Sequence, residues 1–389
     1  MRILVVDAFE RGNRGDAALL SVLLRQGAQA YDGAELAIAG FENPQLWPEF
    51  DGVPNLGSIR RYVGEEGISR GARVLRKLLA LAITLAATTR LTRHLLLAAA
   101  GLLPAEVRRE LRAVAGADLV VAPGGGFLNA RDDFASDLSV FFLLLPLWLA
   151  QRFGVPVVAA PQSYGPFPRS RQRWMVRQVL SNAEVVVVRE DISVRRLHEA
   201  GVDPGRLVRG VDSAFAFSSG SARRWRGELD VPSEATLVVV TARQWLAAQA
   251  QEGYEGALEA GIQHILDLPD HYVVLVPQVT CAFQEDDDRR VNARIIARIQ
   301  HPRLRTITDD TFDHHEALAL YTEADYIIGT RFHSVIFGLT AGVPCVAIEY
   351  DHKTRGIMRD LGLEDWVTGI AEVSPDSLVA LIDRLFATR

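Results

Sequence analysis

The sequence is poor in the residues that build disulfide frameworks and zinc sites. Its 389 residues include two cysteines, Cys281 and Cys345, and neither belongs to a CxxC spacing. Two isolated cysteines predict neither kind of site and fit a reducing cytoplasm. The first residues lead directly into a predicted strand, without the charged and apolar regions of a signal peptide. We therefore expect a cytoplasmic protein with no metal site.

Positive charge is also in short supply. The chain has 42 Lys and Arg against 48 Asp and Glu, which gives a formal net charge of −6. This balance argues against nucleic acid as a partner, because no basic excess is available to neutralise phosphates. The hydrophobic content of 49% is ordinary for a globular enzyme. The length exceeds one comfortable core, so two domains are expected.

The region considered as a possible membrane segment contains no apolar run long enough to span a membrane. Leu78–Ala87 and Leu95–Leu103 are apolar, but Arg90 and Arg93 lie between them. Neither run approaches the roughly 20 residues that a spanning helix needs. We expect core or surface helices here. The alternative is a basic-flanked contact of residues 77–103 with the inner face of a membrane.

Short apolar runs alternate with helical patterns along the whole chain. The predicted strands are Ile3–Val6, Leu36–Ala39, Leu119–Ala122, Val155–Ala160, Val185–Val188, Leu237–Thr241, Tyr272–Val276, Tyr326–Gly329 and Cys345–Ile348. Such alternation indicates parallel sheets covered by helices on both faces. We predict an α/β fold of two doubly wound, Rossmann-like domains facing a cleft, which resembles the GT-B architecture.

A small, polar stretch separates the two halves. It begins at Ser218 and ends at Ser233, with Pro232 inside it, and is predicted to be a linker. The predicted domains are therefore residues 1–217 and 234–374. The last segment, residues 375–389, is predicted to be a helix that packs back on the N-terminal domain.

The most informative segment is the strand end Gly329-Thr330-Arg331-Phe332-His333-Ser334. An apolar helix follows it, so helix N–H groups, a guanidinium, an imidazole and a hydroxyl are expected at the carboxyl end of one strand. This is where α/β proteins bind ligands, and the groups suit an anion and a proton transfer. A structural histidine is the alternative for His333.

Glycine-rich turns follow strands in the first half. The first strand leads to Gly12-Asn13-Arg14-Gly15-Asp16, in which Asp16 is either a ligand-facing residue or the N-cap of a helix beginning at Ala17. The turn lacks the third glycine of a dinucleotide fingerprint.

Two further strands end in the same way. Gly124, Gly125 and Gly126 follow one of them, and Gln162 follows the next. Three consecutive glycines are costly to order unless something approaches the backbone. A bare turn and a rigid loop without a ligand are the alternatives.

Two arginines close strands and suit carboxylate or phosphate recognition. Arg189 has an ion pair with Glu190 or Asp191 as its alternative role. Arg243 has a cation–π contact with Trp245 as its alternative.

Two acidic clusters have metal-like composition. His314 and His315 stand beside Asp309, Asp310 and Asp313, and Glu285–Asp288 is an acidic run. Helix capping is favoured over metal binding for both, because Asp residues offset the macrodipole at a helix start.

The opening GNRGDAALL at residues 12–20, the Gly124–Gly126 loop, TARQW at 241–245 and TRFHSVIFGLTAGVPCVAI at 330–348 together resemble the polysaccharide pyruvyl transferase family. The resemblance runs from residue 3 to about residue 362, and is strongest to the colanic acid and amylovoran branch of exopolysaccharide biosynthesis. It implies transfer of pyruvate from phosphoenolpyruvate onto two hydroxyls of one sugar, with a cyclic ketal and phosphate as products. It implies no metal or organic cofactor.

The residues suit that reaction. His333 is assigned as the general acid, while Arg331 and Arg243 are expected to grip the donor. Ser334 and Lys353 would add phosphate contacts. The acceptor sugar, free or lipid-linked, would meet Asn13, Gly15, Asp16, Gly125 and Gln162 from the N-terminal domain, with Asp16 as a base. A nucleotide-sugar glycosyltransferase, with Glu349 as a ribose ligand, and a non-catalytic polysaccharide-binding protein remain alternatives.

Overall fold

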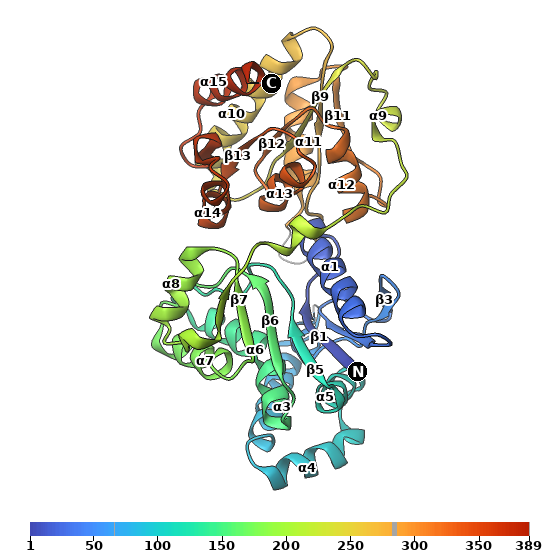
Figure 1. Ribbon diagram of the computed structural model, residues 1–389, viewed down its shortest axis with the longest axis vertical. Coiled ribbons are helices and arrows are strands. Elements are labelled where there is room, and N and C mark those ends of the chain that lie inside the picture. The colour runs from blue at the N-terminus through green and yellow to red at the C-terminus, as the bar shows by residue number, and fades with distance from the viewer. Residues whose placement is uncertain (66, 282–285, 389) are drawn as a thin grey trace. The chain divides into compact units, whose positions relative to one another are not determined.

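The chain folds into two compact units, each built on its own parallel sheet (Figure 1). The computed structural model describes residues 1–65, 67–281 and 286–388. Unit 1 comprises residues 1–10 and 19–213, and unit 2 comprises residues 11–18 and 214–389. Residues 11–18 therefore belong to the second unit, whereas the sequence predicted them in the first.

The sheet of unit 1 has six parallel strands in the order β2-β1-β5-β6-β7-β8. Their bounds are β1 (Arg2–Ala8), β2 (Glu35–Gly40), β5 (Leu119–Ala122), β6 (Val157–Gln162), β7 (Val185–Val188) and β8 (Leu207–Arg209). A separate antiparallel hairpin consists of β3 (Glu49–Phe50) and β4 (Val53–Pro54). The strand order reverses between β1 and β5, which is the switch point where this kind of sheet binds ligands.

Helices cover both faces of this sheet. They are α1 (Arg14–Ala30), α2 (Ile59–Gly64), α3 (Arg70–Ala86), α4 (Arg90–Ala98), η1 (Ala99–Leu102), α5 (Ala105–Gly116), α6 (Phe134–Phe153), α7 (Ser170–Leu180), α8 (Asp191–Glu199) and η2 (Pro204–Arg206). Successive strand residues face opposite sides. Leu4 and Val120 accordingly pack with α5 and α6, whereas Ile3 and Val121 pack on the other face beside Leu23 of α1.

The sheet of unit 2 repeats the pattern in the order β11-β10-β9-β12-β13-β14, all parallel. The strands are β9 (Thr236–Thr241), β10 (His271–Leu275), β11 (Leu304–Thr306), β12 (Tyr326–Gly329), β13 (Cys345–Glu349) and β14 (Val367–Gly369). Here the order reverses between β9 and β12. The predicted pair of doubly wound parallel sheets is thus confirmed, and the predicted strands are all found.

Unit 2 also carries helices on both faces of its sheet. They are α9 (Trp225–Glu228), α10 (Ala248–Asp267), α11 (Asp288–Ile299), α12 (His314–Glu323), α13 (Phe332–Thr340), α14 (His352–Asp360), η5 (Glu364–Trp366) and α15 (Pro375–Ala387), after η3 (Ser213–Ala216) at the chain crossing. Residues of α10, α11 and α15 form one core with the sheet. On α13, Gly338 lets the helix lie directly on β12, because a Cβ there would overlap the Ile327 side chain.

Two predictions about unit boundaries were wrong. Residues 218–233 are no loose linker: they contain α9, whose Trp225 is buried in unit 2, and Arg226 binds the Asp325 carboxylate at 2.7 Å. The final helix α15 packs within unit 2 on α10. Gly261 of α10 makes room for Ile382 of α15 there. The apolar face of α15 could not reveal from sequence which core would cover it.

One helix of the described residues is long and apolar enough to cross a membrane. It is α6, and 56% of its most apolar 18-residue window is buried inside the structure. The core helix of a globular domain passes the same test, and α6 supplies Val140, Leu144 and Leu147 to the core of unit 1.

The core of unit 1 also buries a carboxyl group. Glu110 accepts a hydrogen bond from the Ile59 backbone N–H, and its burial raises its pKa from an ordinary 4.5 to about 8. The folded chain therefore holds a proton that the unfolded chain releases between these two values. Stability contributed by this proton is complete below pH 4.5 and is lost as the pH rises through 8.

We expect Glu110→Gln to flatten the pH dependence of stability in unit 1. The parent should lose unfolding free energy between pH 5 and pH 8 at up to about 1.4 kcal/mol per pH unit, because one more proton is bound in the folded state. Urea unfolding at several pH values measures this. The matched control is Glu35→Gln, which lies exposed at the start of β2. An equal slope in parent and Glu110→Gln would contradict the assignment.

Candidate functional site

Three neighbouring strands of unit 2 end at a cluster of charged side chains. Arg243 follows β9, Arg331 and His333 follow β12, and Tyr350 and Lys353 follow β13. Because β9, β12 and β13 are adjacent and parallel, their carboxyl ends lie at one edge of the sheet. The strand order reverses between β9 and β12, so the cluster occupies the switch point. The sequence had predicted this convergence for Arg243, Arg331, His333 and Lys353.

The turn after β12 is fixed by hydroxyl groups. Thr241 Oγ1 accepts from the backbone N–H of Thr330 at 3.0 Å and of Arg331 at 3.3 Å. The Ser334 hydroxyl is fully buried, donates to the Arg331 carbonyl and lies 2.9 Å from Thr241 Oγ1. These contacts hold Ser334 inside the strand-to-helix turn. They favour a structural role over the phosphate contact predicted from sequence.

The Arg331 guanidinium is held by two carboxylates. Its Nε donates to Asp288 at 3.0 Å, and its terminal nitrogens bind Asp286 and Asp288. Burial by itself would lower the pKa of Arg331, but Asp288 and Asp286 outweigh burial and raise the pKa above its ordinary value. Burial raises the pKa of Asp288 in turn. Arg331 was predicted to bind the donor directly. To do so, it would have to bind the donor while it is also paired with Asp286 and Asp288.

Arg243 is the more available guanidinium. It lies over two aromatic rings, 4.0 Å from the ring centre of Tyr350 and 4.5 Å from that of Trp245. One terminal nitrogen lies 3.6 Å from the Asp286 carboxylate, which thus bridges Arg243 and Arg331. Its Nε is buried and has no hydrogen-bond partner within residues 1–65, 67–281 and 286–388. A buried donor of this kind usually has a partner.

Tyr350 reports the local electrostatic field. Its ring lies 5.7 Å from the Lys353 ammonium and is half-buried. Burial would raise the pKa of its phenol, but the charges of Lys353, Arg243 and Arg331 outweigh burial and lower the pKa below its ordinary value. Lys353 itself lies 3.9 Å from Asp351 and 5.3 Å from the ring centre of Phe332. The charges of Lys353, Arg243 and Arg331 therefore favour an anion at these strand ends.

His333 lies buried in the first turn of α13, directly against the backbone of Gly15. A Cβ at Gly15 would overlap the imidazole ring at Nδ1 and Cγ. The absence of a side chain at position 15 is therefore a packing requirement of His333. The sequence had assigned Gly15 to substrate binding from the N-terminal domain, whereas residue 15 belongs to unit 2.

Arg14 holds this segment in unit 2, and sequence reasoning missed it. Its guanidinium donates to the Phe312 carbonyl at 2.7 Å, the Gly12 carbonyl at 2.8 Å and the Thr280 hydroxyl at 2.7 Å. The Thr280 backbone N–H also donates a hydrogen bond to the Gly12 carbonyl at 2.8 Å. Phe312 and Thr280 lie 298 and 266 residues away in sequence, so no local pattern could have shown these contacts.

The start of α1 differs from its prediction. The helix begins at Arg14, and the Asn13 side-chain oxygen accepts from the backbone N–H groups of Gly15 and Asp16. Asn13 therefore takes the capping position that was the alternative role of Asp16. Asp16 lies in the first helical turn and accepts from the Asn13 amide at 2.8 Å. Both polar side chains belong to unit 2 with His333.

The Gly124–Gly126 loop in unit 1 follows β5, beside the switch point of that sheet. A Cβ at Gly124 would approach the Pro161 carbonyl to 2.7 Å, and Gly125 has a φ of 139°. The Ser163 N–H donates to the Gly125 carbonyl at 2.9 Å, and the Asn129 amide donates to that of Gly126 at 2.8 Å. What approaches the backbone is the neighbouring β6 segment. These contacts favour the bare-turn alternative for the glycine loop. Gln162 is buried beside the loop, and its role in ligand binding stays a prediction.

Arg189 has the ion pairs that were its alternative role. Its guanidinium is fully buried and binds Asp212, the Ser163 hydroxyl at 2.8 Å and the Glu190 carboxylate at 3.6 Å. Asp212 rather than Asp191 is the main partner. A guanidinium committed to this network serves the core of unit 1, which corrects its assignment to the substrate.

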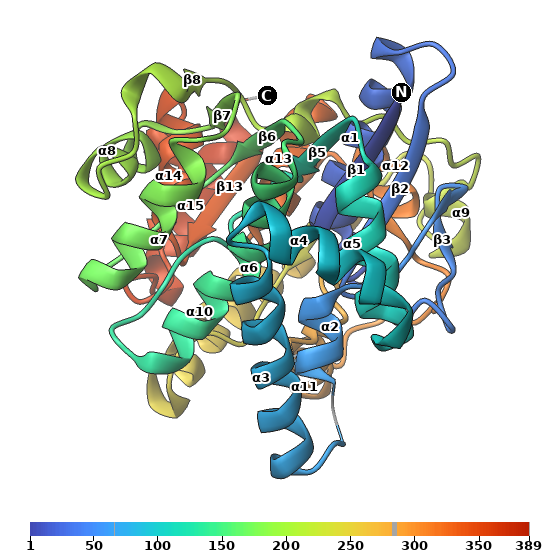
Figure 2. The same ribbon diagram turned by 90° about the horizontal axis from the view of Figure 1, so that it is seen from below.

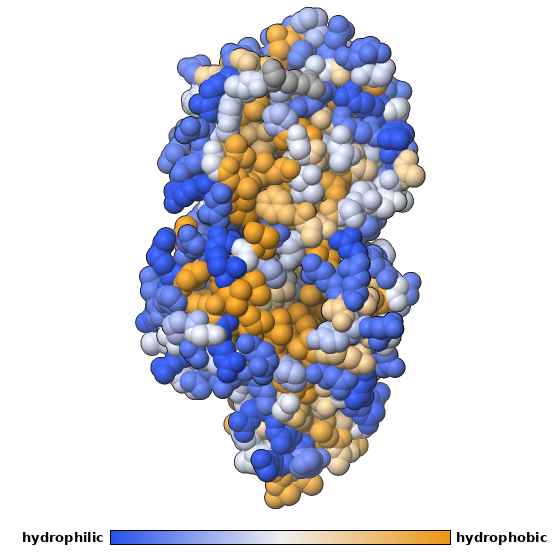
Figure 3. Space-filling model, viewed as in Figure 1, coloured by the Kyte–Doolittle hydropathy of each residue, from blue (hydrophilic) through white to orange (hydrophobic). Residues whose placement is uncertain are grey.

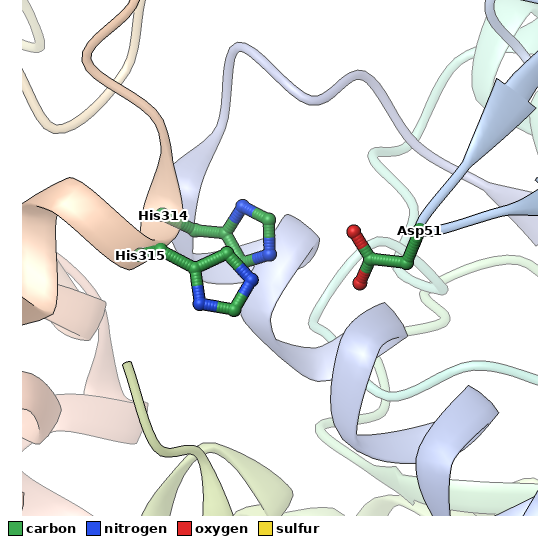
Figure 4. Close-up of side chains that lie close together, drawn as sticks. All are labelled: Asp51, His314 and His315. Atoms are coloured by element: carbon green, nitrogen blue, oxygen red, sulfur yellow. The ribbon is translucent and has the colours of Figure 1, made fainter. Parts of the chain in front are cut away.

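The acidic clusters are helix caps, as favoured from sequence. Asp313 accepts from the N–H groups of His315 and Glu316 at the start of α12, and Asp287 accepts from the Arg289 N–H at the start of α11. Glu285 of the second run lies outside the described residues. Figure 4 shows the His314 and His315 rings side by side, with centres 4.3 Å apart, while the third labelled residue, Asp51, belongs to unit 1.

Unit 1 contains one further polar group that sequence reasoning missed. Asp7, at the end of β1, has a φ of 54°, and burial raises its pKa to about 7 although Arg60 lies 4.0 Å away. The Arg60 guanidinium lies over the Phe9 and Phe41 rings, 5.0 and 5.2 Å from their centres. The sequence signal that could have revealed Asp7 was an acidic residue near the end of an apolar strand.

Glu349 was the lone acid considered for gripping a nucleotide ribose. In the structure its carboxylate accepts from the Arg355 guanidinium, with the Nε bond at 2.6 Å. That pairing gives Glu349 a partner on the following helix. It removes the one residue that favoured the glycosyltransferase alternative.

Solved structures share the fold of this chain. A UDP-GlcNAc 2-epimerase from Methanocaldococcus jannaschii is 10% identical, with a TM-score of 0.56 over 98% of this chain and 92% of that one. The Anabaena protein HepE, solved with UDP-glucose, is 14% identical, with a TM-score of 0.51 over 100% and 99% of the two chains. At such identities the likeness concerns the fold, which is GT-B-like as predicted.

Sequence comparison gives the family. The amylovoran biosynthesis protein AmsJ of Erwinia amylovora is 26% identical over 278 residues, which are 68% of this chain and 65% of AmsJ. The chain thus matches a little less than two thirds of the length of that relative. The family model for polysaccharide pyruvyl transferases matches residues 13–352, which include Arg243, Arg331 and His333 and end one residue before Lys353. This chain belongs to the polysaccharide pyruvyl transferase family.

Proposed function

We propose that this protein transfers pyruvate from phosphoenolpyruvate to two hydroxyls of one sugar in a polysaccharide or its precursor. The products are a cyclic ketal and inorganic phosphate. The observation that carries the proposal is the gathering of Arg243 and Lys353 around the Tyr350 ring, at the same edge of the sheet in unit 2 as His333. Membership of the pyruvyl transferase family supports the reaction type.

The donor suits these cations. Phosphoenolpyruvate carries a carboxylate and a phosphate, which favour guanidinium and ammonium partners. Arg243 offers a buried Nε donor, and Lys353 offers its ammonium nearby. The Asp286 carboxylate already bridges Arg243 and Arg331, so an anion is tolerated at that position. We assign donor binding to Arg243 and Lys353, with Arg331 contributing charge.

The chemistry requires a proton at a carbon atom. His333 as imidazolium donates it to the methylene carbon of phosphoenolpyruvate, and the neighbouring carbon becomes electrophilic. One sugar hydroxyl attacks that carbon and loses its proton, and the carbon–oxygen bond to phosphate breaks. The second hydroxyl then attacks the same carbon and closes the ring. Of the two hydroxyl protons, one restores His333 and the other leaves with phosphate.

Asp16 is the proposed base that takes the proton of one hydroxyl and passes it to the departing phosphate. It lies one residue from Gly15, whose backbone touches the His333 ring, and its carboxylate is oriented by the Asn13 amide. The scheme uses no metal or organic cofactor. We also propose a cytoplasmic location, which the two isolated cysteines support.

A phosphate-release assay separates this proposal from its alternatives. Phosphoenolpyruvate is offered with a panel of nucleotide-linked and lipid-linked sugars, and phosphate is measured. A glycosyltransferase would instead consume a labelled sugar nucleotide, and a non-catalytic binding protein would bind sugar without turnover. Phosphate release that needs both donor and acceptor is the expected result. If no phosphate were released with any acceptor and a sugar nucleotide were consumed, the glycosyltransferase alternative would replace the proposal.

We expect His333→Ala to lower phosphate release by about 10²–10⁴-fold, the usual contribution of a positioned general acid. Thermal unfolding should show a folded protein, since alanine is a strong helix former and position 333 lies in the first turn of α13. The matched control is His264→Ala, a partly exposed histidine on α10 that should keep parental activity. Undiminished turnover of His333→Ala would remove the acid assignment.

Gly15→Ala tests the contact between α1 and the imidazole. The added methyl group overlaps the ring, so His333 must move, and we expect kcat to fall by at least about tenfold with a stability cost of about 1–3 kcal/mol. Steady-state kinetics and thermal unfolding measure both. Gly253→Ala on α10 is the control, because a Cβ there meets nothing within 4 Å. Equal kcat for Gly15→Ala and parent would contradict the packing.

Arg243→Gln tests donor binding. Loss of a charge-assisted contact costs about 1.5–3 kcal/mol, so KM for phosphoenolpyruvate should rise by about 10–100-fold. The acceptor KM should change much less. Arg298→Gln, on an exposed face of α11, is the control. A parental KM for phosphoenolpyruvate in this variant would mean that other residues bind the donor.

A further inference from the structure

Helices α3 and α4 of unit 1 present a row of large aliphatic side chains to solvent. Eight of the eighteen exposed large hydrophobic residues in the described chain fall between positions 74 and 102. They are Val74, Leu75, Leu78, Leu81, Leu85, Leu91, Leu95 and Leu102, with exposed fractions from 47% to 90%. Single exposed leucines are normal, but a contiguous group marks an interaction surface. We call these eight residues the α3–α4 surface.

The spacing of these residues gathers them on one side of each helix. In α3 they recur at intervals of three and four from Val74 to Leu85, while Ala80 and Ile83 on the other side are buried. In α4 no residue is buried, and Leu91 and Leu95 stand one turn apart. The helices therefore hold an apolar face that the fold of unit 1 does not cover.

The charge of this region is one-sided. Residues 67–105 contain no Asp or Glu, although the whole chain has 48 among 389 residues. They contain six Arg and Lys, namely Arg70, Arg73, Arg76, Lys77, Arg90 and Arg93. Arg76 binds Glu65, and Arg93 lies over the Phe153 ring. Positive charge thus gathers here in a protein whose net charge is −6.

The basic residues border the apolar face. Arg70, Arg73 and Lys77 are spaced three and four apart, which forms a row along α3 beside the exposed leucines. Arg90 begins α4 and precedes Leu91. Figure 2 shows both helices at the front of unit 1, and Figure 3 shows hydrophobic residues at the end of that unit where Figure 1 places α4.

We propose that the α3–α4 surface docks on a membrane that contains anionic lipids. An amphipathic helix with Lys and Arg beside an aliphatic face lies in the plane of the interface, where leucines enter the acyl region and cations meet lipid phosphates. The helices have 17 and 9 residues, too few to cross the roughly 30 Å of hydrocarbon. The contact is peripheral.

The composition of the surface favours a membrane over a protein partner. The cores of protein interfaces are enriched in aromatic residues and Met. Residues 67–105 contain no Phe, Tyr, Trp or Met. An aliphatic face bordered by one sign of charge matches a lipid surface, which offers hydrocarbon and phosphate without shape. The charge complementarity to anionic headgroups selects the lipid class.

The consequence for the reaction rests on the proposed function. If the acceptor sugar is carried on a membrane lipid, docking through α3 and α4 brings the protein to its substrate. The docking itself requires no catalysis. The inactive variant His333→Ala should therefore bind vesicles as the parent does, and its binding separates a failure of docking from a failure of the proposed function.

Sedimentation with vesicles tests the proposal. The full chain is mixed with vesicles of phosphatidylcholine alone, or of phosphatidylcholine with phosphatidylglycerol. We expect sedimentation with the anionic vesicles, much less with the neutral ones, and a decrease at high salt because exposed charges are screened. Absence of sedimentation with anionic vesicles would overturn the proposal, as would equal binding to both kinds at every salt concentration.

Two variants localise the contact. Leu78→Glu with Leu91→Glu places carboxylates on the apolar face of each helix, and should lower vesicle binding by at least about tenfold, because each acid must leave water for the interface. Arg70→Gln with Lys77→Gln should weaken binding to anionic vesicles and reduce its salt dependence. Since all four side chains lie on the surface, folding should be unaffected, as thermal unfolding would verify.

Controls exclude other occupants of the surface. Leu46→Glu with Leu361→Glu changes two exposed leucines elsewhere, and should bind vesicles as the parent does. Light scattering of the parent and of Leu78→Glu with Leu91→Glu should give the same mass. A dimeric parent that these substitutions make monomeric would assign the face to a second copy of the chain and overturn the proposal. Parental vesicle binding by the same variant would do so too.

Discussion

The close approach of the Gly15 backbone to the His333 imidazole is the constraint on which the candidate site depends. A side chain at position 15 would occupy the place of the ring. The approach is possible because Arg14 fastens residues 11–18 to Phe312 and Thr280 through buried, charge-assisted hydrogen bonds. A turn that leaves the first strand of unit 1 is thereby built into unit 2. The run of polar and glycine residues at 12–16 therefore anchors the start of α1 in unit 2.

The doubly wound topology explains why the charges meet. The strand order reverses between β9 and β12, so the helices that follow these strands diverge to opposite sides and leave their N-terminal turns open. Arg243 and His333 stand on the two sides of that opening, and Lys353 follows the next strand. Asp286 and Asp288 neutralise Arg331, which leaves Arg243 and Lys353 as the cations with the least committed hydrogen-bonding capacity. The proposed anionic donor would complete this arrangement.

Unit 1 has a different balance of polar groups. One charged network of this unit, Arg189 with Asp212, Glu190 and Ser163, is buried, and the Gly124–Gly126 loop packs against the β6 segment. Arg189, which the sequence placed among the substrate-binding residues, is held in the core of this unit instead. Its exposed features are α3 and α4, where leucines and cations face solvent. Catalytic chemistry and surface attachment are therefore assigned to different parts of the chain.

The sequence by itself determined the periodic features. Apolar strands alternating with amphipathic helices fixed two parallel sheets, and Arg243, Arg331, His333 and Lys353 were predictable because each follows a strand whose carboxyl end must lie at a sheet edge. Tertiary structure alone decided which charges are free to act. Arg331 and Arg189 looked alike in sequence to Arg243, but their carboxylate partners are 43 and 23 residues away, so only folding could bring them together. The contact of Gly15 with His333 and the packing of α15 on α10 were likewise decided by the tertiary structure. A local sequence pattern determines whether a segment is a helix or a strand, whereas distant contacts determine which segments pack together.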